Sequence, residues 1–253
     1  MIKGLYSAVS AMIMNANRQQ VLSHNVSNME VPGFKQILST AEDYLQTSVA
    51  DPMDILEDRD SVREVGMLGL GVKNGQEMID FSQGGIQITN NIYDLAIQGT
   101  GFFHIKTPEG DRYTRDGRFI RDASGMLVTT EGYQVLGKNS QTIKIPDGQV
   151  EIGSAGEILI NGVAASQLDF VEFEKPEEML EHDQGNLFKT NGTPTAAKNS
   201  SIIQGALETS NVNSAQVMTQ MIEILRAYEA AQQMVQNQDE LLGKTISSLG
   251  RIG

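Results

Sequence analysis

The fold of this chain is decided by one stretch, residues 217–249, which read VMTQMIEILRAYEAAQQMVQNQDELLGKTISSL. Apolar residues recur in it at alternating steps of four and three, which is the spacing of a coiled-coil seam. The seam positions are Val217, Met221, Ile224, Tyr228, Ala231, Val235, Gln238, Leu242, Thr245 and Leu249. Only Gln238 and Thr245 interrupt the stripe. The pattern predicts a single long C-terminal helix with one apolar face.

The N-terminus carries a weaker stripe with the same spacing. Its members are Leu5, Val9, Met12, Ala16, Gln19, Ser23 and Val26. Pro32-Gly33 is a stop signal for this helix, and Asn213 with Gln216 three residues later is a start signal for the C-terminal one. Because neither end can bury its stripe alone, the two terminal helices are predicted to pair.

The region between the helices has the character of β structure. From about residue 66, short runs rich in Ile, Val, Phe and Tyr alternate with small and polar residues that tolerate turns. The predicted turns are Gly84-Gly85, Glu109-Gly110, Asp116-Gly117, Ser124-Gly125, Glu131-Gly132 and Asn161-Gly162. Residues 176–205 lose this rhythm and become rich in Glu, Asn, Thr and Ser, so an irregular arm is expected there.

The predicted fold class is α+β, with long N- and C-terminal helices forming a coiled-coil-like stalk and a central, mainly antiparallel β domain. Four segments follow from the patterns: an N-terminal helix over 1–32 that pairs with the C-terminal helix, a partly acidic connector over 33–75, the central β domain over 76–207, and the C-terminal helix over 208–253. Within the connector, residues 42–64 hold eight acidic residues and two arginines, which favours a solvated segment. The alternative is a cation site, but the EF-hand ligand pattern is missing.

Composition excludes several classes of function. The formal net charge of −13 argues against general binding to nucleic acid or anionic lipid, both of which require concentrated Lys and Arg. The chain has no cysteine, which excludes disulfides and thiolate metal sites. It has no run of about 18 apolar residues and no signal-peptide pattern, so no membrane insertion is expected.

The sequence offers no catalytic, cofactor or metal site. His24, His104 and His182 fall in three separate segments without the spacing of a helical metal site. Gly99-Thr100-Gly101 lacks the third glycine and the following helix of a dinucleotide fingerprint, so a tight β corner explains it better. We therefore expect that the protein is not an enzyme and has no cofactor.

The C-terminal stripe is longer than a core helix requires. It persists for about nine turns, whereas a helix in a globular protein averages about three. We therefore predict burial against a partner outside the globule, and the alternative is packing onto the chain's own N-terminal helix. The predicted assembly interface comprises Leu5, Val9, Met12, Val26, Val217, Met221, Ile224, Tyr228, Val235 and Leu242.

Three blocks of sequence, in order, resemble the rod and hook family of axial proteins of the bacterial flagellum. The first consists of GLYSA at 4–8, SHNVSN at 23–28 and PGFK at 32–35; the second of YDLAIQGTGFF at 93–103 and YTRDG at 113–117; the third of GALETSNVN at 205–213, MI at 221–222 and RAYE at 226–229. The chain departs from the family pattern at His24, where a second Asn is usual. The short middle region is closer to a rod subunit, of distal or proximal type, than to the hook protein.

This resemblance implies a structural role in the flagellar basal body. It implies a subunit that assembles through its terminal helices into a helical tube, which transmits torque and conducts exported subunits. The implied partners are further copies of the chain, other rod and hook proteins, and the flagellar type III export apparatus, with extracytoplasmic placement and no cleaved signal. Two other hypotheses stay open: an oligomeric β module that binds a glycan or protein surface, and a hydrolase with a carboxylate pair assembled by folding.

Overall fold

The computed structural model describes residues 2–44, 46–50, 64–197 and 200–249, and the chain divides into two compact units. The helical unit comprises residues 1–24, 37–78 and 214–253, and the β unit comprises residues 25–36 and 79–213. Most of the acidic connector predicted over 42–64 lies outside the described residues.

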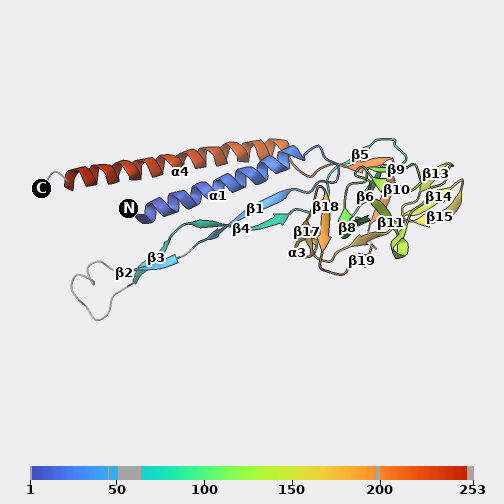
Figure 1. The fold of residues 1–253 in the computed structure, drawn as a ribbon, viewed down its shortest axis with the longest axis horizontal. Helices are drawn as coiled ribbons and strands as arrows, with labels where there is room; N and C mark the ends of the chain where they lie inside the picture. Colours follow the sequence, from blue (N-terminus) through green and yellow to red (C-terminus); the bar gives the residue numbers. More distant parts are fainter. Residues whose placement is uncertain (1, 45, 51–63, 198–199, 250–253) are drawn as a thin grey trace. The chain divides into compact units, whose positions relative to one another are not determined.

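The helical unit combines two helices with paired strands. Helix α1 (Ile2–Ser27) opens the chain and helix α4 (Ser214–Leu249) closes it, beginning directly after the predicted start signal at Asn213 (Figure 1). Four strands lie between them in sequence as two pairs, β1 (Ile37–Asp43) with β4 (Val72–Ile79) and β2 (Gln46–Ala50) with β3 (Glu64–Gly69). These strands occupy much of the segment that was predicted as a connector.

The predicted coiled-coil-like stalk is wrong. The structure is α+β overall, with one N-terminal helix, one C-terminal helix and a large central antiparallel β domain, and its described residues form no long coiled coil. A coiled coil requires two stripes that interdigitate along their whole length. Here α1 has 26 residues against 36 in α4. Part of α1 contacts the strands instead, since the backbone N–H of Val72 donates to Ser10 Oγ over 3.2 Å.

The β unit is built around one ten-stranded antiparallel sheet. Its main path runs through β17 (Leu180–His182), β18 (Leu187–Thr190), β8 (Gly110–Thr114), β7 (Phe102–Thr107), β11 (Gln134–Gly137), β10 (Leu127–Thr129) and β9 (Phe119–Arg121). Three short strands branch from this path: β12 (Gln141–Thr142) from β11, β16 (Phe170–Glu172) from β7, and β19 (Thr195–Ala196) from β16.

Smaller sheets complete the β unit. They are a three-stranded sheet of β13 (Val150–Ile152), β14 (Glu157–Ile160) and β15 (Val163–Gln167), a pair of β6 (Leu95–Gln98) with β20 (Ser201–Gln204), and a pair of β5 (Ile86–Ile88) with β21 (Ala206–Glu208). A 3-10 turn, η1 (Lys138–Ser140), and a short helix, α3 (Pro176–Met179), join neighbouring strands. The pairs β6–β20 and β5–β21 bring the last part of the unit back onto its first part.

Several predicted turns are confirmed because their chemistry is local. Asn161-Gly162 joins β14 to β15 with φ values of 51° and 80°, a left-handed conformation that Asn and Gly tolerate best. Glu109-Gly110, Ser124-Gly125 and Glu131-Gly132 also lie at or between paired strands. Gly84-Gly85 is not a hairpin turn, because Gly85 O instead accepts a hydrogen bond from Thr209 N beside the β5–β21 pair.

The core of the β unit has two parts, divided by the alternation of side chains along β7. Phe103 and Ile105 belong to one apolar cluster, in which Phe103 meets Phe119 edge-on with ring centroids 5.0 Å apart. Phe102 belongs to the other cluster, which also contains Tyr113 and Phe188. Successive residues of β7 therefore bury opposite faces, as expected for a strand in the middle of a sheet.

The irregular arm predicted over residues 176–205 contains four strands, β17 to β20. Its composition is polar, and its strands are stabilised by partners far away in sequence. Phe188 of β18 pairs with Tyr113 of β8, and Ile202 of β20 pairs with Ile97 of β6. Such pairing leaves little local signal, because the stabilising contacts come from other parts of the chain.

Candidate functional site

The predicted seam of α4 is its least exposed face, yet most of it is only half covered. Val217 and Ile224 are buried, with 0% and 7% exposure. The remaining predicted interface residues of this helix are half-buried, namely Met221, Tyr228, Val235 and Leu242. The chain itself therefore shields the beginning of the seam and leaves the rest partly open to water.

A second apolar row on α4 was missed by the sequence reasoning. Met218, Ile222 and Leu225 follow the same four-and-three spacing one position beyond the seam, and they are 54%, 53% and 41% exposed. An exposed apolar row of this kind is a candidate surface for another molecule. The signal was present in the sequence as a wider apolar stripe than one seam requires.

On α1 the predicted residues and the buried residues differ by about one position. Leu5, Met12 and Val26 are half-buried and Val9 is exposed. The buried positions Ala8, Asn15 and Leu22 recur instead at intervals of seven. The sequence reasoning did not find this face because Asn15, a polar residue, lies in its middle.

The offset leaves an apolar row exposed on α1 as well. Tyr6, Val9 and Ile13 are spaced by three and four residues, and Tyr6 and Ile13 are the most exposed of them. We call this row and Met218, Ile222 and Leu225 the exposed helical rows. Both belong to the helical unit, and together they form its candidate interaction surface.

A buried ion cluster joins the three sequence blocks that carry the family resemblance. Glu208 Oε1 accepts hydrogen bonds from Lys35 Nζ over 2.6 Å and from the backbone N–H of Gly84 over 2.9 Å. Its other oxygen, Oε2, accepts one from Arg115 Nη1 over 3.1 Å. Lys35 comes from the first block, Arg115 from the second and Glu208 from the third, so one carboxylate ties all three together.

The cluster is fully enclosed by the β unit. The side chains of Lys35 and Glu208 are 0% exposed and that of Arg115 is 2% exposed. Burial lowers the pKa of Lys35 and of Arg115, and the carboxylate of Glu208 opposes both shifts. Each cation makes one further hydrogen bond: Lys35 donates to Ser82 O and Arg115 donates to Gly99 O, each over 2.7 Å. The cluster is therefore structural and offers no carboxylate to a ligand.

A polar pocket of about 250 Å³ in the β unit does not provide catalytic chemistry. Both carboxylate oxygens of Asp116, which lines it, accept hydrogen bonds from Arg118. Partial burial favours the neutral form of Glu131, but the hydroxyl of Thr130 donates to its Oε1 over 2.8 Å, and the pKa of Glu131 is lowered overall. The lowered pKa keeps Glu131 from acting as a proton donor near neutral pH, and Asp116 is engaged in an ion pair with Arg118.

The histidines do not assemble a metal centre. They lie on α1, β7 and β17, at His24, His104 and His182. Across the described parts of the chain, no three or more His, Cys, Asp or Glu side chains are arranged to hold a metal ion. Neither described terminal helix is long and apolar enough to cross a bilayer.

Comparison with protein-family models finds three matches along the chain. Residues 5–35 match the flagella basal body rod protein model, residues 96–160 match the D1 domain of the flagellar hook protein FlgE/F/G, and residues 203–249 match the C-terminal model of the flagellar basal body rod FlgEFG proteins. The first and third matches cover most of α1 and α4, and the second covers much of the β unit.

Curated relatives align with the chain from end to end. The flagellar basal-body rod protein FlgF of Caulobacter vibrioides is 33% identical over 259 residues, covering 100% of both chains. The flagellar basal-body rod protein FlgG of Bacillus subtilis is 31% identical, covering 98% of this chain and 99% of its own. FlgF of Rhizobium meliloti is 30% identical over 98% of each chain.

Proposed function

The chain belongs to the family of flagellar basal-body rod proteins, and we propose that it polymerises through its terminal helices into the helical tube of the rod. Its place is the basal body of the bacterial flagellum, and its role there is structural and not enzymatic. The subunits join through a surface of these helices, and their repeated joining forms a continuous tube.

The exposed helical rows are the observation that carries this proposal. Tyr6 and Ile13 on α1 and Met218 and Ile222 on α4 are each more than half exposed. Full burial of one such side chain contributes roughly 1.5–3 kcal/mol before the cost of ordering is subtracted. Several of them buried at once between neighbouring subunits would supply a stable contact, and the same face has no comparable use in a monomer.

The geometry of repetition favours a tube. The row on α1 and the row on α4 are different surfaces, so a contact between one row and the other on the next copy is heterologous. Heterologous contacts that do not close a ring generate an open helical filament. A tube of this kind transmits torque along its wall and leaves an axial channel for exported subunits. Other rod and hook proteins, which share these helices, are the proposed neighbours at its two ends.

The remaining proposed partner is the flagellar export apparatus. Family resemblance implies that the chain leaves the cell through this apparatus without a cleaved signal. The half-buried seam of α4, from Met221 to Leu242, is consistent with terminal helices that complete their packing only when neighbours supply the missing surface. Folding of the ends and incorporation into the rod are then coupled.

The decisive experiment places a charge in the exposed row of α4. Ile222→Asp should prevent incorporation, because burial of an unpaired carboxylate in the subunit contact is strongly unfavourable. Basal bodies would be isolated from a strain that lacks this protein and carries the variant, and imaged by negative-stain electron microscopy. Rods that are absent or truncated, together with loss of motility, are the expected result.

The control is Gln232→Asp, which adds the same charge at an exposed polar position of the same helix. It should support complete rods and normal motility, and both purified variants should unfold at the same denaturant concentration as the wild type. Complete rods in the Ile222→Asp strain would refute the assembly surface.

Ile224→Asp should also block incorporation while the β unit stays folded, but it disturbs packing within the chain too, because Ile224 is already buried.

A further inference from the structure

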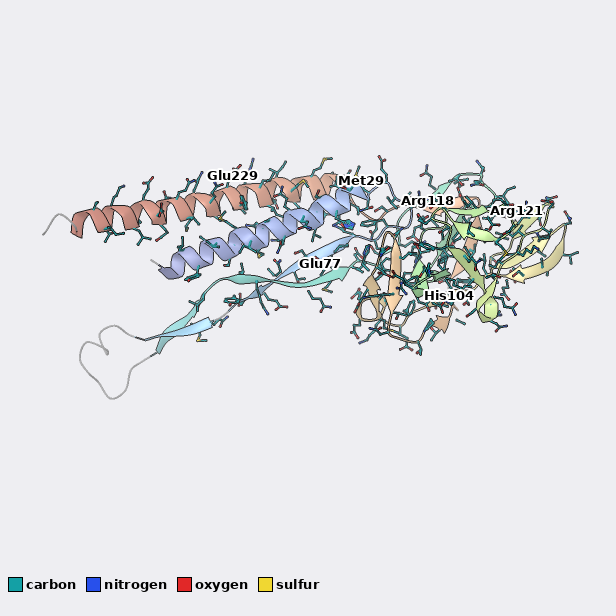
Figure 2. All side chains as sticks on the ribbon, in the orientation of Figure 1. Met29, Glu77, His104, Arg118, Arg121 and Glu229 are labelled. Carbon is teal, nitrogen blue, oxygen red and sulfur yellow. The ribbon has the colours of Figure 1, made fainter. Side chains whose placement is uncertain are left out.

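His104 lies in the β unit (Figure 2), where it contacts two residues of β8 and one residue just before β16. The residue belongs to β7 and is 6% exposed. Its ring stacks on the ring of Tyr113 from β8, with centroids 5.1 Å apart and planes 16° from parallel. Its Nδ1 lies 2.9 Å from Asp169 Oδ2, just before β16, and its Nε2 lies 3.4 Å from Asp111 Oδ2 on β8. The imidazole therefore sits between two carboxylates.

The positions of the two carboxylates around the His104 ring favour its charged form. A neutral imidazole carries one N–H, and the shorter contact assigns that hydrogen to Nδ1, which donates to Asp169. The lone pair of Nε2 then faces the carboxylate of Asp111, and Nε2 is buried with no hydrogen-bond partner among the described residues. Protonation of Nε2 converts this repulsion into an attraction between the imidazolium and the Asp111 carboxylate, whose Oδ2 lies 3.4 Å away.

We propose that His104 is a proton-dependent brace, which as imidazolium binds Asp111 and Asp169 and thereby ties β7, β8 and the start of β16 together. In its neutral form the brace keeps one of its two links. Asp111 is 54% exposed, so it can turn toward water when the ring loses its charge. The β unit is accordingly most stable in mildly acidic medium, and it loosens along the β7–β8 hairpin as the medium becomes alkaline.

The charges around the ring agree with this assignment. Burial lowers the pKa of His104, but the hydrogen bond and charge of Asp169, joined by the charge of Asp111, outweigh burial and raise the pKa above its ordinary value. The folded-state pKa is thus higher than the unfolded one. The added stability is complete below about pH 6.5 and is lost as pH rises through the folded-state pKa.

Two further titratable side chains neighbour these carboxylates, Tyr113 and Lys106. Burial and the same two acids raise the pKa of Tyr113, so its hydroxyl stays neutral in this pH range. On the other side of β7, strand β11 places Gln134 and Val135 in register with the strand, and neither residue titrates. Lys106, on the same strand as His104, is exposed and pairs in register with Asp111.

The test compares the wild-type chain with His104→Phe, which keeps an aromatic ring on Tyr113 and removes the proton site. Urea unfolding of the full chain would be followed by far-UV circular dichroism from about pH 5.5 to about pH 8.5, the range in which histidine titrates. The wild-type folding equilibrium constant should fall across this range. In His104→Phe the fall should be largely abolished. Equal slopes for the two proteins would overturn the proposal.

Two further measurements keep the test independent of how well the variant folds. The ring protons of the wild-type histidines, observed by NMR, should show one titration above the ordinary value, and this titration should be absent from His104→Phe. In Asp111→Asn, the same titration should move downward. His182→Phe, on β17 and separated from β8 by strand β18, should retain the wild-type slope. A His104 titration at or below the ordinary value would refute the brace.

Discussion

The two units of this chain differ in where their apolar side chains lie. The β unit contains both buried apolar clusters, with Phe103 and Ile105 at 0% exposure, and an ion cluster buried around Glu208, although its rim leaves Ile88 and Val163 exposed. The helical unit keeps Tyr6, Ile13 and Ile222 in water. Apolar rows left open on a helix gain stability when another molecule covers them. In the proposed function the buried clusters therefore supply folding stability, and the exposed helical rows supply the assembly contact.

The ion cluster gives the largest test of this division. Glu208→Ala should lower the free energy of unfolding of the β unit by about 3–5 kcal/mol, because it leaves Lys35 and Arg115 buried without their counter-charge. Equilibrium unfolding in urea, followed by tyrosine fluorescence of dilute protein, measures the loss. Glu181→Ala, which breaks an ion pair with Lys189 that is 62% and 48% exposed, is the control and should leave the transition where it is. A Glu208→Ala protein as stable as the wild type would contradict the division.

A smaller loss of stability is expected from adding one carbon atom at a tightly packed glycine of the β unit. A Cβ at Gly117 would overlap the carbonyl oxygen of Leu95, whereas a Cβ at Gly69 of β3 meets nothing within 4 Å. Gly117→Ala should therefore destabilise the chain by about 1–3 kcal/mol through overpacking. Gly69→Ala in the helical unit should be close to neutral. Thermal and urea unfolding of both variants measure this difference. Equal stabilities of the two variants would contradict the prediction.

The smallest effect has the opposite sign and concerns α4. Gly243 is exposed within the helix, and a Cβ there would also meet open space. Gly243→Ala should raise helix stability by about 0.5–1 kcal/mol, because Gly loses more backbone freedom on folding than Ala. Circular dichroism of dilute protein during urea unfolding is the measurement. The reverse change at an exposed position of the same helix, Ala230→Gly, should lower stability by a similar amount.

Local features of the fold were predictable from the sequence. The turn at Asn161-Gly162 and the start of α4 after Asn213 follow from residues within a few positions of each other. The β strands of residues 180–204 were not predictable in this way. Their stability comes from pairing with β8 and β6, about 70 and 100 residues earlier, and polar segments of this kind carry little pattern of their own.

The candidate site likewise has a part that was predictable from local sequence and a part that was not. The seam of α4 could be located because its apolar residues repeat within one helix. The face that α1 buries could not, because Asn15 occupies its middle and a polar residue does not enter an apolar count. Lys35, Arg115 and Glu208 were visible as parts of three family blocks, but only the folded β unit brings their charges within 3.1 Å of one carboxylate. Periodicity predicts the faces of helices, and it carries no information on contacts between residues far apart in sequence.

Two hydrogen bonds tie the residues that follow Pro32 to the residues around Glu208. The N–H of Gly33 donates to the carbonyl oxygen of Glu208 over 2.7 Å, and the N–H of Gln36 donates to Asn211 Oδ1 over 2.8 Å. Two stretches of the β unit, residues 33–36 and 208–211, are therefore tied side by side. Segments with adjacent ends can be lengthened, shortened or exchanged as a cassette without moving the chain on either side. The chain between these two stretches is thus free to change in length while the residues that flank it keep their contacts.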